Sequence, residues 1–180
     1  SVERLLRCAG RVPGLASASG KWVAGWHCSD AAHDTAEAAR DLLLSPEIDA
    51  AVFQLDWRSI VAEGMPVDRY DLLVLLDDEP PAGTSSVTAS SAPAHVDAVD
   101  SRHAALHPLL RGLQPGATVL AAAAARGSVA DRLDPGVASM LLHDPSDATA
   151  LLPAVAKALG LQVSADTIRE ATALAPSRSR

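Results

Sequence analysis

The sequence predicts an α/β fold in three layers, with a mostly parallel β-sheet flanked by helices on both faces. Residues 48–55 (IDAAVFQL) and 71–76 (DLLVLL) are apolar almost throughout, as are strands covered on both faces. Segments with helical spacing alternate with such runs, a pattern typical of parallel sheets. A chain of 180 residues can bury one sizeable core, so we expect a single domain over residues 1–176 and a frayed tail at 177–180.

The first half of the chain supplies most of the predicted sheet. Apolar residues at helical spacing predict a helix over residues 2–8, which ends at Gly10. A buried strand over residues 12–18 follows, and residues 21–26 allow a second. Residues 34–44 predict a helix in which Asp34 and Glu37 form a capping box. A short helix over residues 59–63 joins the two apolar strands.

The second half begins with a change of composition. Residues 78–93 are rich in Pro, Ser, Thr and Gly and offer no face for packing, so we expect a flexible loop over about 78–100. Beyond it, the spacing predicts helices over residues 102–111, 149–159 and 164–174, with Ser164 as the N-cap of the last. Strands are expected over residues 117–122 and 137–142.

Composition excludes several classes of function. Fifteen Lys and Arg oppose 22 Asp and Glu, and the net charge of −7 disfavours a general nucleic-acid binder. No apolar run approaches the roughly 18 residues of a membrane span, and the first residues do not form a signal peptide. We therefore expect a cytoplasmic protein in which Cys8 and Cys28 are free thiols. The start at Ser1 rather than Met suggests a processed product or a fragment.

Residues 14–21 (GLASASGK) invite comparison with a phosphate-binding loop, but the match is poor. Five residues separate the glycines instead of four, and Trp22 stands where a hydroxyl would meet magnesium. A helix should also follow the lysine, whereas residues 22–26 predict a strand or a turn. We interpret this segment as structural.

Other candidate sites are weak in the sequence. His27, Cys28, Asp30 and His33 fit no closed zinc pattern and predict a polar surface turn. We interpret the spacing of His103 and His107 as chance, and no serine or cysteine has the setting of a nucleophile. The acidic group Asp77-Asp78-Glu79 follows a strand, where α/β sheets bind ligands, although acids in such loops are usually only solvated.

Residues 4–76 resemble the Mur-ligase-like module of cyanophycin synthetase. Residues 5–10 (LLRCAG) are similar to the family's ILRAAG segment, and residues 12–25 to its VGLTTTDGIYIDG. Residues 43–52 (LLSPEIDAAV) resemble VLLDPRVDAAVL, and residues 60–71 (IVAEGMPVDRYD) resemble ILREGLAFDRCD, the most specific piece. The resemblance implies the central, ATP-binding type of Mur ligase fold, in which ATP hydrolysis is coupled to amide-bond formation.

The sequence departs from this family where the chemistry would lie. The resemblance places the phosphate-binding loop before Ser1, and neither Lys21 nor Lys157 takes the place of its lysine. Gln54 stands where the family has a magnesium-binding glutamate, and a neutral amide supplies no charge to a hard dication. Trp57 and Arg58 replace part of an ARGG segment, Asp77 replaces an asparagine, and alanines at 121–124 occupy the place of NADD.

These departures predict a degenerate domain without catalytic residues or a metal site, in which Gln54, Trp57, Arg58 and Asp77 mark the lost positions. No cofactor is expected. The predicted role is structural, within a homo-oligomer or beside a synthetase or ATP-grasp partner domain. The alternative is an ATP- and magnesium-dependent carboxylate–amine ligase whose phosphate-binding loop lies outside this chain. A module that binds an acidic or arginine-bearing peptide is a third possibility.

Overall fold

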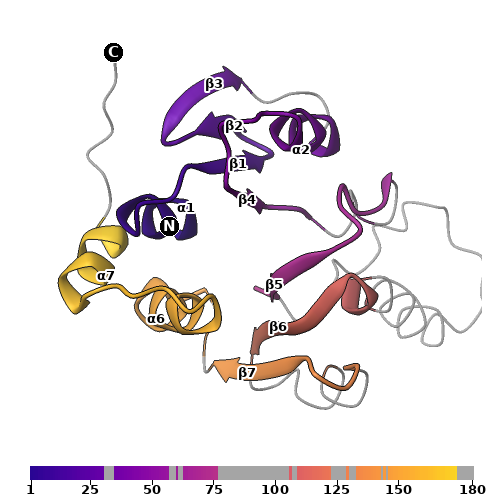
Figure 1. Ribbon diagram of the computed structural model, residues 1–180, viewed down its shortest axis with the longest axis vertical. Helices are drawn as coiled ribbons and strands as arrows, with labels where there is room; N and C mark the ends of the chain where they lie inside the picture. The colour runs from indigo at the N-terminus through magenta and orange to yellow at the C-terminus, as the bar shows by residue number, and fades with distance from the viewer. Residues whose placement is uncertain are drawn as a thin grey trace, which may run out of the picture.

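The chain forms a mixed α/β structure, which was obtained as a computed structural model (Figure 1). It describes residues 1–30, 35–56, 60, 63–76, 106, 109–122, 129, 133–142, 144 and 146–173. Within these ranges the helices and strands follow one another as α1 (Val2–Cys8), β1 (Pro13–Ser17), β2 (Gly20–Val23), β3 (Trp26–Asp30), α2 (Thr35–Leu43), β4 (Ala50–Phe53), β5 (Tyr70–Val74), β6 (Leu113–Ala122), β7 (Ala138–Leu142), α6 (Ala148–Ala158) and α7 (Ala165–Thr172).

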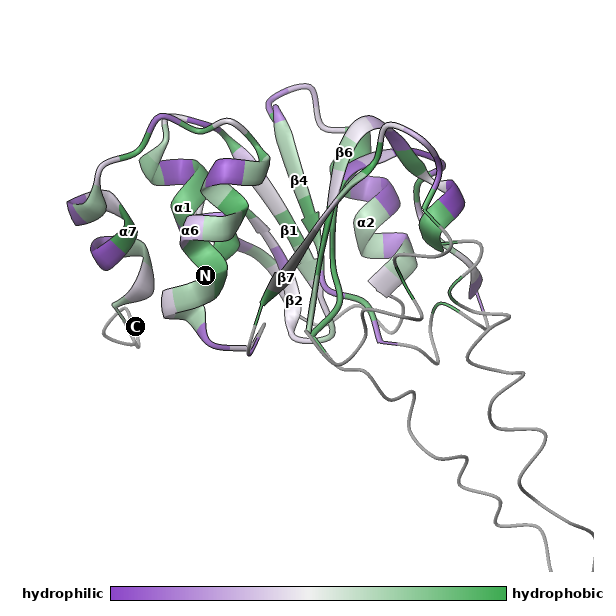
Figure 2. Cartoon of the chain, turned by 90° about the horizontal axis from the view of Figure 1, so that it is seen from below, coloured by the Kyte–Doolittle hydropathy of each residue, from purple (hydrophilic) through white to green (hydrophobic). Residues whose placement is uncertain are grey.

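The described strands form two sheets. The first has the order β3-β2-β1-β4, in which β1 pairs antiparallel with β2 and parallel with β4. The second has the order β5-β6-β7 and is parallel throughout. β4 and β6 run the same way in Figure 2, so the parallel strands of both sheets end at one edge of the molecule. We call this the carboxyl edge.

Helices pack on both sides of the strands (Figure 2). On one side α1, α6 and α7 form a group that contacts β1, β4, β6 and β7. On the other side α2 packs on β1, β2 and β4. This placement follows from the sequence because α2 buries small residues on one face, which lets the helix approach the sheet closely; they are Ala36, Ala38 and Ala39.

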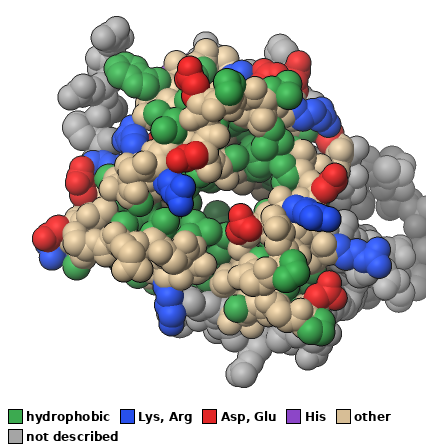
Figure 3. Space-filling model, viewed as in Figure 1, with side chains coloured by type: hydrophobic (Ala, Val, Ile, Leu, Met, Phe, Trp, Pro, Cys, Tyr) green, Lys and Arg blue, Asp and Glu red, His purple; other side chains and the backbone are tan. Residues whose placement is uncertain are grey.

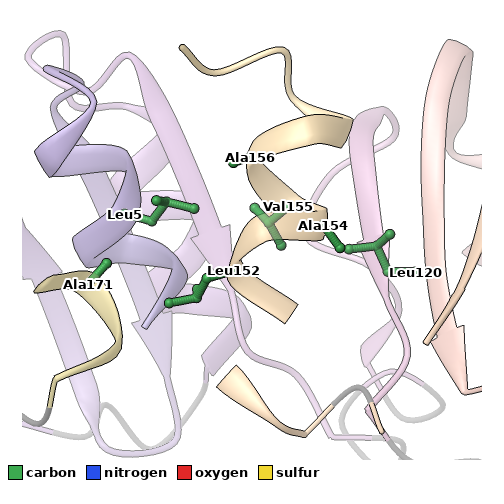
Figure 4. Close-up of a cluster of buried hydrophobic side chains, with 7 residues drawn as sticks. All are labelled: Leu5, Leu120, Leu152, Ala154, Val155, Ala156 and Ala171. Carbon is green, nitrogen blue, oxygen red and sulfur yellow. The ribbon is translucent and has the colours of Figure 1, made fainter. Parts of the chain in front are cut away.

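One buried cluster joins α1 to α6 and α7. Leu5 of α1 and Leu152 of α6 are at most 1% exposed, and Ala171 of α7 packs with them (Figure 4). Leu120 of β6 reaches the same cluster, whereas its neighbour Val119 points to the opposite face. This alternation is the two-residue period of a strand, and it lets β6 contribute buried residues to a core on each of its faces.

A clamp of polar contacts also holds α1 against α7. The Ser1 ammonium donates to the carbonyl of Ala171 at 2.9 Å, and the Arg4 guanidinium donates to the carbonyl of Ala173 at 2.8 Å. Burial, followed by the nearby positive charge of Arg4, lowers the pKa of the Ser1 amino group. The first and last described helices are therefore fixed to each other.

Most of the predicted elements are confirmed within one or two residues, with three differences. Trp26–Asp30 is an exposed strand instead of the predicted polar turn, because it pairs with β2 as an edge strand. β6 begins four residues before the predicted position and continues through Pro115 and Gly116. The parallel strands also form two separate sheets instead of the single sheet that we expected. The predicted loop at 78–100 and the tail at 177–180 lie outside the described residues.

No helix in the described part of the chain has the length and apolar character needed to cross a membrane.

Candidate functional site

The carboxyl edge is the first place to look for a site, because open α/β sheets bind ligands beyond the carboxyl ends of their strands. β1 ends there at Ser17, and β4 ends at Phe53 with Gln54 directly after it. Leu75 and Leu76 follow β5 in the same way. The described side chains at this edge are therefore neutral for the most part, and Asp56 is the nearest acid that follows β4.

Gln54 is fixed by its backbone and free to present its side chain to solvent. Its N–H donates to the carbonyl of Ala16 at 2.9 Å, which extends the parallel ladder between β1 and β4 by one bond. Gln54 is exposed. The strand predicted over residues 48–55 included Gln54, whereas β4 ends at Phe53 and leaves Gln54 directly after it. The amide of Gln54 can donate and accept hydrogen bonds but carries no charge.

Residues 14–21 form a β-hairpin and not a phosphate-binding loop, as we interpreted them. The hydroxyl of Ser17 lies 2.9 Å from that of Ser19 and also accepts from the Ser19 N–H, which closes the turn between β1 and β2. Lys21 belongs to β2, and its ammonium donates to the Asp41 carboxylate of α2 at 2.9 Å. This lysine is therefore held on the side of the sheet where α2 packs.

Most of the other expected site residues lie outside the ranges that the structure describes. Trp57, Arg58 and Asp77 lie outside the described residues, as do Asp78, Glu79, His33, His103 and His107. Of the alanines at 121–124, the first two end β6 at the carboxyl edge, and Ala121 is buried. Within the ranges that the structure describes, Gln54 is thus the member of the predicted set whose position can be stated.

Metal-ligating side chains do not converge in the described ranges, where no three of His, Cys, Asp or Glu are placed to share an ion. Cys8 and Cys28 are exposed and free, as predicted. Cys28 lies in β3 and donates to the carbonyl of Trp26 at 3.4 Å, and the His27 ring packs on Trp22 with 5.2 Å between the ring centroids. These contacts fit a strand pairing with its neighbour.

A pocket at the opposite end of the second sheet was not predicted. It has a volume of about 310 Å³ and is lined by Met65, Val67, Asp68, Tyr70, Arg111 and Gly112. The Tyr70 hydroxyl is buried without a hydrogen-bond partner, and burial raises the pKa of Tyr70 to about 12. Such a phenol stays neutral at physiological pH. No sequence pattern predicts this pocket, because its residues come from two segments some forty positions apart and match no motif.

Comparisons with known proteins do not assign the chain to a family. No protein-family profile matches it, and no curated protein matches it.

Proposed function

We propose that this chain is a catalytically inert relative of the Mur-ligase-like module of cyanophycin synthetase, with a structural or partner-binding role. In this proposal the two sheets and their helices correspond to the three-layer central domain of a Mur ligase. The domain would support a homo-oligomer or a synthetase or ATP-grasp partner domain. The resemblance over residues 4–76 is the reason for naming this family.

Gln54 is the observation that carries the proposed loss of catalysis. It stands at the carboxyl end of β4, where the resembled family has a magnesium-binding glutamate, and its neutral amide gives a hard dication no charge. Phosphoryl transfer depends on positioned cations that balance the charge developing on the phosphate. Without a carboxylate at this position, the strand end would bind magnesium more weakly, and phosphoryl transfer depends on that cation.

The two lysines support the same proposal. The Lys21 ammonium is paired with the Asp41 carboxylate of α2 at 2.9 Å. Lys157 is an exposed residue in the last turn of α6, at the far end of the helix from β7. The charge of Lys21 is thus already balanced by a carboxylate, and Lys157 belongs to the end of a helix rather than to a loop that follows a strand.

Isothermal titration with ATP and MgCl₂ tests the proposed loss of nucleotide binding. We expect no binding to the 180-residue chain, and also none to the Gln54→Glu variant, because one restored carboxylate does not replace the other missing groups. Micromolar binding by the unaltered chain would contradict the proposal and favour an active ligase. Unchanged circular dichroism of the variant would show that the fold is kept.

Two further measurements test the structural role. Analytical ultracentrifugation over a range of concentrations is expected to show a homo-oligomer if the domain supports its own assembly. A chain that stays monomeric at every concentration would rule out that form of the role and leave a heterologous partner domain. Retention of the chain on an Asp/Arg polymer would instead support a peptide-binding module.

A further inference from the structure

The two sheets face each other across a gap that is bordered by β4 and β5. β4 pairs with β1 on one side and β5 pairs with β6 on one side, and neither pairs with a described strand on the other. The two strands do not pair with each other, whereas direct neighbours in a sheet lie about 4.8 Å apart and are hydrogen-bonded. Figure 3 shows a hollow between the two halves of the molecule at this position.

The hydrogen bonds of β4 and β5 show which of their backbone N–H and C=O groups point into the gap. The Gln54 N–H donates to Ala16, and the Leu75 N–H donates to the carbonyl of Leu120 at 2.9 Å. Along a parallel strand, successive residues bond alternately to the two sides. The N–H and C=O groups of the alternate residues therefore point into the gap; these residues are Ala51 and Phe53 on β4, and Leu72 and Val74 on β5.

β4 and β5 are less buried than other strands of similar composition. β1 and β6 have a neighbour on each side, and Ala16, Val119 and Leu120 are fully buried there. In β4 no residue is buried, and Ala51 is exposed. In β5 the residues from Tyr70 to Val74 are half-buried or exposed in the same way. The difference follows the missing neighbour, because both strands are as apolar as those that are buried.

β4 also lacks the features that protect a free strand edge from pairing. Natural edges carry charged residues, proline or bulges. β3, an outer edge of the first sheet, has the polar sequence WHCSD, whereas β4 reads AAVF and β5 reads YDLLV. The sequence of β4 is therefore that of a strand inside a sheet, and so is that of β5 after Asp71 and the register irregularity between Tyr70 and Leu72.

From these observations we propose that the gap is a docking site for one extended, apolar strand of a partner polypeptide, which runs parallel to β4 and β5 and joins the two sheets. A single strand is the occupant that satisfies both edges at once, since a strand bonds on both sides. Because β4 and β5 run the same way, one strand can run parallel to both, as β1 does to β4 and β6 does to β5. Its side chains would be apolar on both faces, because α1 and α6 lie on one side and α2 on the other. This inference deepens the proposed partner-binding role and rests on it.

Residue-resolved hydrogen exchange tests the open edges in the chain alone. We expect the amides of Ala51, Phe53, Leu72 and Val74 to exchange at least tenfold faster than those of Val52 and Leu73, which point to existing neighbours. Equal protection of the two groups would show that the edges are already paired, and would overturn the proposal.

A peptide probe tests the occupant. The synthetic peptide IDAAVFQL, which copies residues 48–55, has the apolar pattern of an interior strand. Its addition is expected to slow exchange at Ala51, Phe53, Leu72 and Val74 at least tenfold. The matched control is the same peptide with proline in place of the valine that copies Val52. Proline removes one backbone N–H donor, so this peptide should give no protection. Unchanged exchange with the first peptide, or equal protection by both, would overturn the proposal.

Protection that grows with protein concentration, without peptide and together with dimer formation, would assign the gap to a second copy of the chain and would also overturn the proposal. The docking proposal and the proposed loss of catalysis are tested separately, because the ATP titration needs no peptide. The two results can therefore disagree.

Discussion

The aromatic ring of Tyr70 lies directly over Gly112, so that a Cβ at position 112 would overlap the ring. The Tyr70 N–H also donates to the Gly112 carbonyl at 2.9 Å, which fixes the start of β5 beside the residue that precedes β6. The two residues thus determine how the amino ends of these strands meet.

Gly112→Ala should destabilise the protein because the added methyl group forces the Tyr70 ring out of its place. We expect a loss of about 1–3 kcal/mol in the free energy of unfolding, measured by urea denaturation. The control is the same change in a Tyr70→Leu background, where the overlap is absent and the added cost should shrink. An equal cost in both backgrounds would show that the ring does not cause the effect.

The pH dependence of Tyr70 gives a second prediction. Burial raises its pKa to about 12, whereas an unfolded tyrosine titrates near 10. Because the folded state holds the proton more tightly, its contribution to stability is complete below about pH 10 and is lost as the pH rises towards 12. The chain has one tyrosine, so tyrosinate absorbance reports this residue alone. A native midpoint equal to that in urea would contradict the burial of the hydroxyl.

Arg7 and Arg11 provide a matched pair for surface charge. Arg7 lies 4.0 Å from the buried carboxylate of Glu3, and it also donates to the carbonyl of Ala24 at 3.1 Å. Arg11 is half-exposed and pairs with the half-exposed Asp49 at 3.8 Å. Arg7→Leu should lower the free energy of unfolding by about 1–3 kcal/mol, because it leaves the Glu3 carboxylate without its cation and the Ala24 carbonyl without its donor. Arg11→Leu should cost at most about 1 kcal/mol.

Thermal and urea unfolding of the two variants would measure this difference. Equal losses would show that Arg7 acts as an ordinary surface charge. A Glu3→Gln variant completes the comparison: if the Arg7 effect comes from the buried carboxylate, Arg7→Leu should cost less in the Glu3→Gln background than in the unaltered protein.

Ala24 has a φ of 51°, in the left-handed region that disfavours residues with a Cβ. Ala24→Gly should therefore stabilise the protein by about 0.5–1 kcal/mol, even though glycine is more flexible when unfolded. The control is Ala9, whose φ of −82° suits any residue. Ala9→Gly should lower stability by about 0.5–1 kcal/mol. The same sign for both changes in a urea melt would refute the proposed strain at Ala24.

The parts of the fold that could be predicted are those with a clear hydrophobic period. Residues 48–55 contain β4, and residues 71–76 include all of β5 except Tyr70, because apolar runs of that length suit strands. β3 was missed because Trp26–Asp30 is polar and exposed, so its pairing with β2 leaves no alternation in the sequence. The early start of β6 was missed because Pro115 and Gly116 normally interrupt strands.

The candidate site was predictable only where a residue belongs to a clear apolar run. Gln54 could be placed near the carboxyl end of a strand because it is the second-last residue of the run 48–55, although β4 ends one residue before it. The pocket at Tyr70 could not, because it depends on contact between residues far apart in the sequence. The gap between β4 and β5 was equally hidden, since its two edges look like ordinary interior strands in the sequence.

The clamp between Ser1 and Ala171 has a consequence for synthesis of the protein in the cell. Ribosomes release the amino end first, yet Leu5 has no exposed surface only when Leu152 and Ala171 are packed with it. Closing a contact 170 positions long also costs more chain entropy than closing a short loop. The apolar face of α1 must therefore wait until α6 and α7 have left the ribosome, and during translation it is a surface that chaperones can bind.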